Sequence, residues 1–194
     1  QVIEHRRLHE AVTRQSQYER SIIPERGAIY DRHGQILARS LPAPTVCLIP
    51  GDDDLPAELF ARAERLKNIV NLSEKDLQKI RSRIESKENY IYIKRKIGWD
   101  QAERISRLNL KNIYVQRENR RFYPLNSLAA HVLGGVNVDG EGQSGVELQY
   151  NARLEGVKGL SLILRDANKR RYDWEILKEP EPGQDLVLTL DETI

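Results

Sequence analysis

The segment at residues 26–38, RGAIYDRHGQILA, constrains the fold of this chain more than any other stretch. Two short apolar runs flank the tetrapeptide DRHG, in which Asp31 stands at the first and Gly34 at the fourth position of a type I turn. Turn residues between two apolar runs are typical of two paired strands. The sequence therefore predicts a β-hairpin over this segment.

The same segment carries three charged side chains: Arg26, Asp31 and Arg32. Its strands are suited to a half-buried sheet, and a charge removed from water needs a partner. A candidate partner is Glu147, far along the chain in the segment GVELQYNARLEG. Arginine forks that meet carboxylates give geometric specificity as well as energy, so one interpretation is that these four residues form a structural charge hub. The alternative is that all four are exposed charges, worth about 0–1 kcal/mol each.

Glycines stand where this arrangement needs turns or helix ends. The amphipathic segment that begins at Glu147 runs to Gly156, and glycine at that place is a typical helix stop. The glycines expected at turns and caps around the hub are Gly27, Gly34, Gly145 and Gly156.

Four motifs follow one another along the chain in a recognisable order. They are RGAIYDRHGQILA from Arg26, RFYP from Arg121, AHVLG from Ala130, and GVE at Gly145 leading to LEG at Gly156. In this order they resemble the N-terminal pedestal of class B penicillin-binding proteins, the single-span membrane enzymes that cross-link bacterial peptidoglycan. Any one motif alone is weak evidence, but four in order are specific, and the resemblance covers nearly the whole chain.

The resemblance implies a non-catalytic, extracytoplasmic pedestal that positions a peptidoglycan transpeptidase and binds partners in cell-wall synthesis and cell division. The short insert and the stretch from RRFYP to GVEL resemble the cell-division (septal) branch more than the elongation branch. The implied partners are a membrane glycosyltransferase and other cell-wall assembly proteins, and a homodimer is left open. The parent enzyme is expected to bind peptidoglycan stem peptides and β-lactams without a cofactor. Its place would be the periplasmic face of the bacterial inner membrane, through a single span upstream of Gln1.

No catalytic residue is expected in this chain. Enzymes of the resembled family carry S-x-x-K, S-x-N and K-T-G motifs, because the serine nucleophile needs a lysine beside it to accept its proton. None of the serines here is followed three positions later by lysine. The nearest match to K-T-G, at Lys96, lacks the hydroxyl residue. The chain should therefore be enzymatically silent, while its parent is expected to be a serine-type D,D-transpeptidase.

The predicted fold class is α+β, with a compact α/β head inserted into a β-hairpin-rich anchor subdomain. Apolar residues at helical spacing before Pro24 predict a helix at the start, and PEPG at residues 180–183 is interpreted as a hinge-like linker. The predicted divisions are a juxtamembrane helix at 1–20, the anchor subdomain at 21–49 and 117–183, the head at 50–116, and the first strand of an absent transpeptidase domain at 184–194.

Within the head, the apolar pattern predicts strand, helix, helix, strand, helix and strand in that order. Ser73 followed three positions later by Asp76 resembles a capping box that opens the second helix. The run YIYIKRKI predicts a strand with Ile91, Ile93 and Ile97 on one face.

Composition and acidic segments argue against metals and polyanions. The net charge is only +2, from 31 basic and 29 acidic residues, so the total indicates no polyanionic partner. The three aspartates at residues 52–54 are interpreted as a solvated loop, since neighbouring side chains cannot all converge on one ion. The loop from Asn137 alternates like the start of a calcium site, but Glu147 falls one position early for the closing ligand. The single cysteine, Cys47, excludes an internal disulfide and is interpreted as a small core residue.

Two further features leave alternatives open. His131 in an apolar helix is interpreted as a structural histidine rather than a proton donor, because no serine, cysteine or metal ligand is at hand. The alternative function for the whole chain is a free-standing binder of anionic polymers or nucleic acid, which the balancing acids disfavour. It would use two basic clusters with aromatic neighbours: Lys94, Arg95 and Lys96 with Tyr92 and Trp99, and Arg117, Arg120 and Arg121 with Phe122 and Tyr123.

Overall fold

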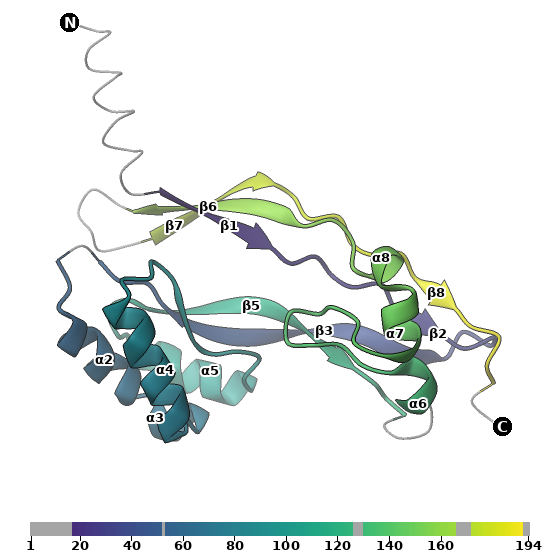
Figure 1. Ribbon diagram of the computed structural model, residues 1–194, viewed down its shortest axis with the longest axis horizontal. Coiled ribbons are helices and arrows are strands. Elements are labelled where there is room, and N and C mark those ends of the chain that lie inside the picture. Colours follow the sequence, from purple (N-terminus) through teal and green to yellow (C-terminus); the bar gives the residue numbers. More distant parts are fainter. Residues whose placement is uncertain (1–16, 52, 126–129, 166–171, 192–194) are drawn as a thin grey trace, which may run out of the picture. The chain divides into compact units, whose positions relative to one another are not determined.

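A computed structural model describes residues 17–51, 53–125, 130–165 and 172–191. The chain divides into two compact units: unit 1 joins Gln1–Leu37 with Leu125–Ile194, and unit 2 is Ala38–Pro124. Unit 1 is thus built from both ends of the chain, and unit 2 from its middle (Figure 1). Helices and strands are mixed in both units, which confirms the α+β class.

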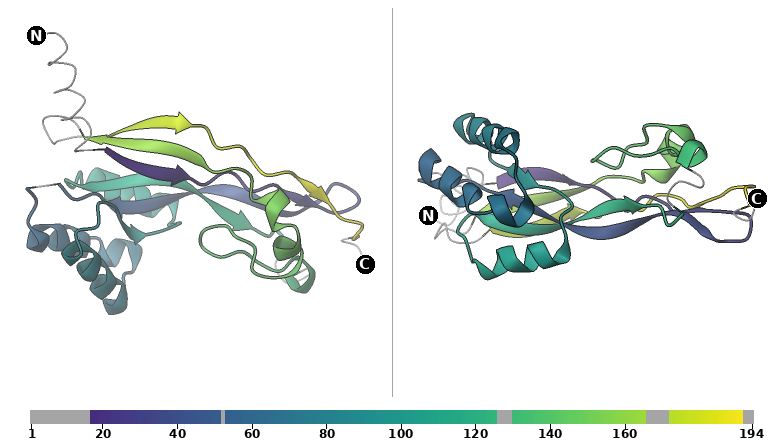
Figure 2. Two further views of the ribbon diagram at one scale, coloured as in Figure 1. Left: turned by 45° about the horizontal axis from the view of Figure 1, so that its top comes forward. Right: turned by 90° about the horizontal axis from the view of Figure 1, so that it is seen from below.

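Unit 2 is a long two-stranded ribbon, extended to three strands at one end and covered there by helices. Strand β3 (Ile36–Leu48) pairs antiparallel with β5 (Ile113–Phe122) and, near its C-terminal end, with β4 (Ile91–Lys94). The helices are α2 (Pro56–Glu64), α3 (Lys67–Val70), α4 (Glu74–Glu85) and α5 (Trp99–Arg107). Both views of Figure 2 show these helices gathered around one end of the ribbon.

The core of unit 2 forms where the apolar stripes of the helices meet one face of the ribbon. Burial of apolar surface is the main force that holds such a layer together. The buried members include Val46 and Leu48 from β3, Leu59 and Ala63 from α2, Leu77, Ile80 and Ile84 from α4, and Ile91 and Ile93 from β4. The predicted order of helices and strands in the head is confirmed, with the short helix α3 added between the first two helices.

The capping box at the start of α4 is confirmed by its two reciprocal hydrogen bonds. The Asp76 amide donates to Ser73 Oγ at 3.2 Å, and the Ser73 amide donates to Asp76 Oδ2 at 3.1 Å. These bonds satisfy two amides that the first turn of a helix leaves without partners. They also hold the pKa of Asp76 below its ordinary value, with the Ser73 amide bond as the largest cause.

The described residues of unit 1 form one three-stranded sheet, one short parallel pair of strands and three short helices. The sheet has the order β1 (Gln17–Ile22), β6 (Gly159–Arg165), β7 (Tyr172–Lys178), with antiparallel pairing throughout. Strand β2 (Ile29–Tyr30) pairs in parallel with β8 (Leu186–Val187). The helices are α6 (Ala130–Leu133), α7 (Gly145–Gln149) and α8 (Asn151–Leu154).

The predicted hairpin at residues 26–38 is confirmed. Strands β2 and β3 are neighbours in one sheet, and the turn between them is closed by the Gly34 amide, which donates to the Asp31 carbonyl at 3.2 Å. Gly34 has a φ of 81°, a left-handed conformation that glycine adopts without steric cost.

The prediction of a helix over residues 1–20 is wrong where the structure describes it. Residues from Gln17 onward form strand β1, which pairs with β6 from Gln17 opposite Leu164 to Ile22 opposite Gly159. Residues 1–16 lie outside the described part of the chain. Apolar spacing is a weak local signal, and pairing with a strand far along the chain overrides it here.

Unit 2, at Ala38–Pro124, includes more residues than the head predicted at 50–116. Strands β3 and β5 stay paired from Leu48 and Ile113 down to Arg39 and Phe122, so the whole ribbon belongs to one unit. At the other end, β8 lies in the segment 184–194 that was predicted to open a following domain, and it pairs with β2 of this chain.

Candidate functional site

The centre of unit 1 is an ion pair between Arg26 and Glu147. Arg26 Nε donates to Glu147 Oε2 at 2.7 Å, and the two side chains are only 5% and 0% exposed. The remaining guanidinium nitrogens donate to Asn151 Oδ1 at 2.8 Å, to the Glu147 carbonyl at 2.8 Å and to the Gly140 carbonyl at 3.1 Å. A rigid planar fork with this many acceptors fixes α7, α8 and the loop before them around one side chain.

Asn151 is a member of this cluster that sequence reasoning missed. Its Oδ1 also accepts the Gly142 amide at 2.8 Å, and its Nδ2 donates to Glu155 Oε2 at 2.7 Å. Asn151 therefore ties the loop before α7 to the helix after it. Its spacing of four residues from Glu147, which places two side chains on one helical face, was the available signal.

Three stretches of unit 1 cross next to this ion pair at very short distances. The Gly27 amide donates to the Leu154 carbonyl at 2.9 Å, and the Gly183 amide donates to the Glu25 carbonyl at 2.8 Å. A Cβ atom on Gly27 would lie 2.0 Å from the Gln184 carbonyl oxygen, and one on Gly183 would lie 1.8 Å from that of Leu154. Only glycine fits at either position, because any side chain would overlap backbone atoms.

The chain beyond this crossing, residues 183–191, is called the exit segment here, and the hairpin holds its backbone along its length. The Leu186 amide donates to the Ala28 carbonyl at 2.9 Å, and the Leu188 amide donates to the Tyr30 carbonyl at 2.8 Å. Just before it, Glu181 exchanges two backbone hydrogen bonds of 2.9 Å with Val157. The interpretation of residues 180–183 as a hinge-like linker is therefore wrong.

Side chains of both the hairpin and the exit segment add further contacts between them. Asp185 Oδ1 accepts the Ala28 amide at 2.7 Å, and Arg32 Nε donates to the Thr189 carbonyl at 3.0 Å. His33 Nε2 lies 3.2 Å from Asp191 Oδ2. The hairpin turn thus contacts the last residues of the exit segment that the structure describes.

The four residues predicted to form the charge hub take different positions. Arg26 and Glu147 are in direct contact. Asp31 is buried in the hairpin turn, where its Oδ1 accepts the amides of His33 at 2.8 Å and Gln35 at 2.7 Å. Arg32 is exposed and contacts the exit segment. The structure thus joins two members directly, while the other two order the hairpin and its contact with the exit segment.

Of the predicted turn and cap glycines, Gly27 and Gly156 lie at this crossing, whereas Gly34 lies in the hairpin turn and Gly145 beside α6. Gly145 opens α7 with a φ of 57°, and Gly156 follows α8 with a φ of 70°. Glycine is required at position 27 because the exit segment approaches its backbone closely, and not because of its φ.

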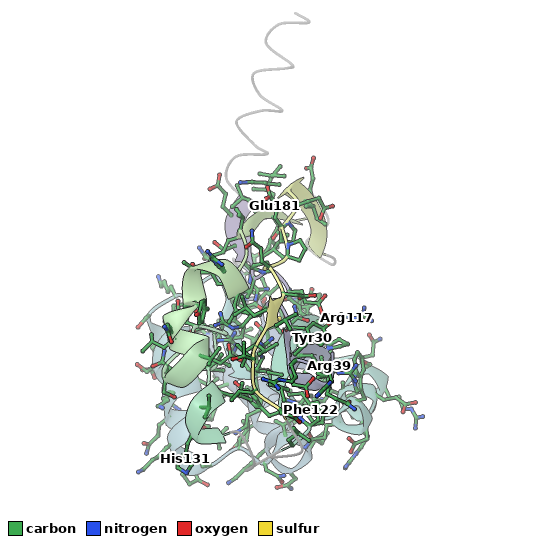
Figure 3. All side chains as sticks on the ribbon, turned by 90° about the vertical axis from the view of Figure 1, so that its right-hand side faces the viewer. Tyr30, Arg39, Arg117, Phe122, His131 and Glu181 are labelled. Atoms are coloured by element: carbon green, nitrogen blue, oxygen red, sulfur yellow. The ribbon has the colours of Figure 1, made fainter. Side chains whose placement is uncertain are left out.

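His131 does not have the position that its sequence context indicated. It is exposed on α6 and lies at the lower end of the view in Figure 3. Its neighbour Val132 is 47% exposed, whereas Leu133, two positions later, is buried, with 2% exposed. The interpretation as a structural histidine is wrong, because α6 is only four residues long and turns Leu133 rather than His131 toward the core.

The aspartate loop is also different from its prediction, because Asp54 is buried in an ionic cluster of unit 2. Its side chain is 4% exposed and accepts the Gly51 amide at 2.7 Å, Lys111 Nζ at 2.8 Å and Asn112 Nδ2 at 2.9 Å. Arg62 Nη1 donates to it at 3.3 Å. Burial raises the pKa of Asp54, but the hydrogen bonds and the Lys111 charge outweigh burial and bring the pKa below its ordinary value.

The basic clusters are partly neutralised by acids within unit 2. Lys94 Nζ lies 3.4 Å from Asp76 Oδ2, and Arg95 Nε lies 2.9 Å from Glu118 Oε2. The Arg117 guanidinium lies 5.9 Å from the centre of the Trp99 ring. Among the described residues, no three histidine, cysteine or acidic side chains converge as a metal site would require.

Comparisons with known proteins agree with this fold. The family model described as "Penicillin-binding Protein dimerisation domain" matches residues 21–188. The chain is 34% identical over 174 residues to "Probable peptidoglycan D,D-transpeptidase PenA" of Neisseria gonorrhoeae, covering 87% of this chain and 29% of that protein. It is 30% identical over 171 residues to "Peptidoglycan D,D-transpeptidase FtsI" of Escherichia coli (strain K12), covering 87% and 29%. It therefore spans less than a third of the length of these relatives.

Two solved structures with the same fold are also penicillin-binding proteins. The penicillin-binding protein PBP2 of Helicobacter pylori, in its complex with MreC, superposes with a TM-score of 0.64 at 22% identity, covering 91% of this chain and 36% of that one. Penicillin-binding protein 2B of Streptococcus pneumoniae gives 0.63 at 17% identity, covering 92% and 42%. Among the described residues, no helix has the length and apolar character of a membrane span. The two relatives named above are peptidoglycan D,D-transpeptidases. Because the family model matches residues 21–188, this chain belongs to the family of penicillin-binding protein dimerisation domains.

Proposed function

We propose that this chain is the non-catalytic pedestal of a penicillin-binding peptidoglycan transpeptidase, and that unit 1 sets the direction in which the chain leads into the enzyme. The observation that carries the proposal is the exit segment. The amides of residues 186 and 188 donate hydrogen bonds to the hairpin, and the Arg32 side chain donates one to the Thr189 carbonyl. These bonds support a fixed direction of the segment rather than a free linker.

The buried ion pair gives this direction its rigidity. Arg26 and Gly27 are consecutive, so the side chain of one holds α7 and α8 while the backbone of the other meets Leu154 and the exit segment. Buried polar groups with many partners tolerate few alternative arrangements. Arg26, Asp31, Arg32 and Glu147 would then act together, two at the centre and two at the hairpin turn.

The chain itself is proposed to be catalytically silent, and the serine-type D,D-transpeptidase activity to lie in the longer protein. Incubation with a fluorescent penicillin tests this directly. The expected result is no covalent label on this chain and one labelled serine in the longer protein. Label on the chain alone would contradict the proposal.

The proposed setting is the extracytoplasmic face of a bacterial inner membrane, in septal cell-wall synthesis. The resemblance of the motifs supports this branch, and the similarity to FtsI of Escherichia coli supports a peptidoglycan transpeptidase as the longer protein. The proposed partners are a membrane glycosyltransferase and other cell-wall assembly proteins, as the MreC complex of Helicobacter pylori PBP2 illustrates for a protein of the same fold. A homodimer is the second arrangement that the family description supports.

The positioning role is tested in the longer protein with Arg32→Ala and Glu147→Gln. Both variants should still be acylated by fluorescent penicillin at the normal rate, because neither residue belongs to the catalytic domain, while septal peptidoglycan incorporation in cells falls. Arg32→Ala is the cleaner variant, since it removes an exposed contact with Thr189 and leaves the buried ion pair in place. Normal incorporation by both variants would contradict the positioning role.

A further inference from the structure

The outer edge of β5 is an open strand edge in the described part of the chain. Strand β5 pairs with β3 over its full length of 10 residues, and no other described strand pairs with its second side. An unpaired edge presents a row of amides and carbonyls that a further extended segment can bind.

Each face of β5 carries one exposed arginine and one exposed apolar residue along this edge. On the face that Val46 shares, Val115 is 36% exposed and Arg117 is exposed. On the opposite face, Arg120 is exposed and Phe122 is 39% exposed. Arg117 and Phe122, labelled in Figure 3, mark the two faces.

Trp99 enlarges the first of these faces. It begins α5 and is 56% exposed, with the Arg117 guanidinium over its ring. Tryptophan and arginine are the residue types that most often carry binding energy at protein interfaces.

The charge of this edge favours an acidic partner. Strand β5 contains three arginines and one glutamate, and that Glu118 is held by Arg95 and by Thr45 Oγ1, each at 2.9 Å. Neither Arg117 nor Arg120 forms an ion pair with any acid among the described residues. A second copy of β5 would bring like charges together, which destabilises paired strands.

We propose that β5 binds an extended, acidic segment of a partner protein by strand addition, with carboxylates of the segment meeting Arg117 on one face and Arg120 on the other. The partner's backbone would complete the hydrogen bonding of the edge, and its apolar residues would cover Val115 and Phe122. This surface lies in unit 2, whereas the positioning role belongs to unit 1. Each of the two proposals can therefore be disproved while the other stands.

The probe is a synthetic peptide as long as β5, with two glutamates three positions apart to match the spacing of Arg117 and Arg120 among threonine and valine residues. Its binding is followed by fluorescence anisotropy. Combining Arg117→Gln with Arg120→Gln should weaken binding by about tenfold or more, because both charge contacts are lost. The matched control combines Lys75→Gln with Lys79→Gln, which removes two exposed positive charges from α4 of the same unit and should leave binding within about twofold.

Two further peptides separate strand addition from general attraction. A peptide with the same charges but with methylated amides at alternate positions cannot donate hydrogen bonds to an edge, so it should lose binding. Equal binding of the methylated peptide would overturn the proposal, because charge alone would then explain it. Equal binding of the original peptide to the double glutamine variant would also overturn it, and the arginines would then serve only to block association between strand edges.

Discussion

At the scale of single residues, burial decides which charges matter. Arg26 and Glu147 are 5% and 0% exposed, whereas Arg107 and Glu103 form a similar short pair on α5 with both side chains more than half exposed. Removing one member of a buried pair leaves the other charge without compensation, while an exposed pair is screened by water. The two pairs therefore offer a direct comparison.

Glu147→Gln is expected to lower the free energy of unfolding by about 3–5 kcal/mol, because Arg26 keeps its charge in a buried place. The same change at Glu103 should cost less than about 1 kcal/mol. Urea denaturation followed by circular dichroism measures both. Similar losses of unfolding free energy for the two variants would show that burial does not make the Arg26–Glu147 pair more important for stability than the exposed pair.

The Asp54 cluster predicts a pH dependence with a definite sign. The pKa of Asp54 in the folded protein lies below its ordinary value of 3.8, so the unfolded chain takes up the proton first as the pH falls. The stability that Asp54 contributes is complete well above pH 3.8, begins to fall as the unfolded chain takes up the proton, and is lost as the pH falls through the folded pKa.

Asp54→Asn should therefore be less stable than the native protein by a constant amount from neutral pH to about pH 5, and the difference should shrink at lower pH. Denaturation midpoints measured over this range test the prediction. A difference that stays constant down to about pH 3 would mean that the carboxylate charge contributes nothing.

At the scale of elements, the short parallel pair of β2 and β8 has the largest consequence. Two residues on each strand are a small element, but side-chain contacts from Arg32, His33 and Asp185 extend it in both directions. Order in the exit segment therefore comes from the hairpin rather than from the segment's own sequence.

Hydrogen exchange should show this order directly. The amides of Leu186 and Leu188 donate to the hairpin and should exchange slower than in an unfolded chain, by a factor on the order of a hundred. Val187, whose side chain is 70% exposed, lies between them as an internal comparison. Exchange of all three amides at unfolded rates would restore the hinge interpretation.

The glycine crossing offers a second test at this scale. Gly183→Ala would place a Cβ 1.8 Å from the Leu154 carbonyl oxygen, so the backbone must shift, at a cost of about 1–3 kcal/mol. Gly135→Ala is the matched control, because nothing lies within 4 Å of the position its Cβ would take. Thermal unfolding compares them, and equal melting temperatures would contradict the close approach seen at Gly183.

At the scale of the whole molecule, the charge balance weighs against the anionic-polymer alternative. The net charge is +2, and two of the predicted basic residues, Lys94 and Arg95, have acidic partners. Few released counterions mean a weak dependence of binding on salt. The protein should therefore leave an anionic column at low salt, and retention beyond about 0.5 M salt would revive the alternative.

Local signals in the sequence were sufficient for several features. The DRHG turn, the capping box at Ser73 and the order of helices and strands in unit 2 follow from turn chemistry and apolar period, which act over a few residues. The pairing of Arg26 with Glu147 came instead from the principle that a buried charge needs a partner, together with the order of the family's motifs.

The tertiary structure alone decided the rest. Strand β1 forms because β6 lies beside it, Asp54 is buried because three basic or amide side chains from elsewhere surround it, and the exit segment is ordered because the hairpin holds it. In each case the partner lies many residues away, and a local pattern contains no information on which distant segment will arrive. The sequence by itself determined which elements form and which charges need partners, whereas the contacts between distant segments determined which charges are buried and where the chain is held.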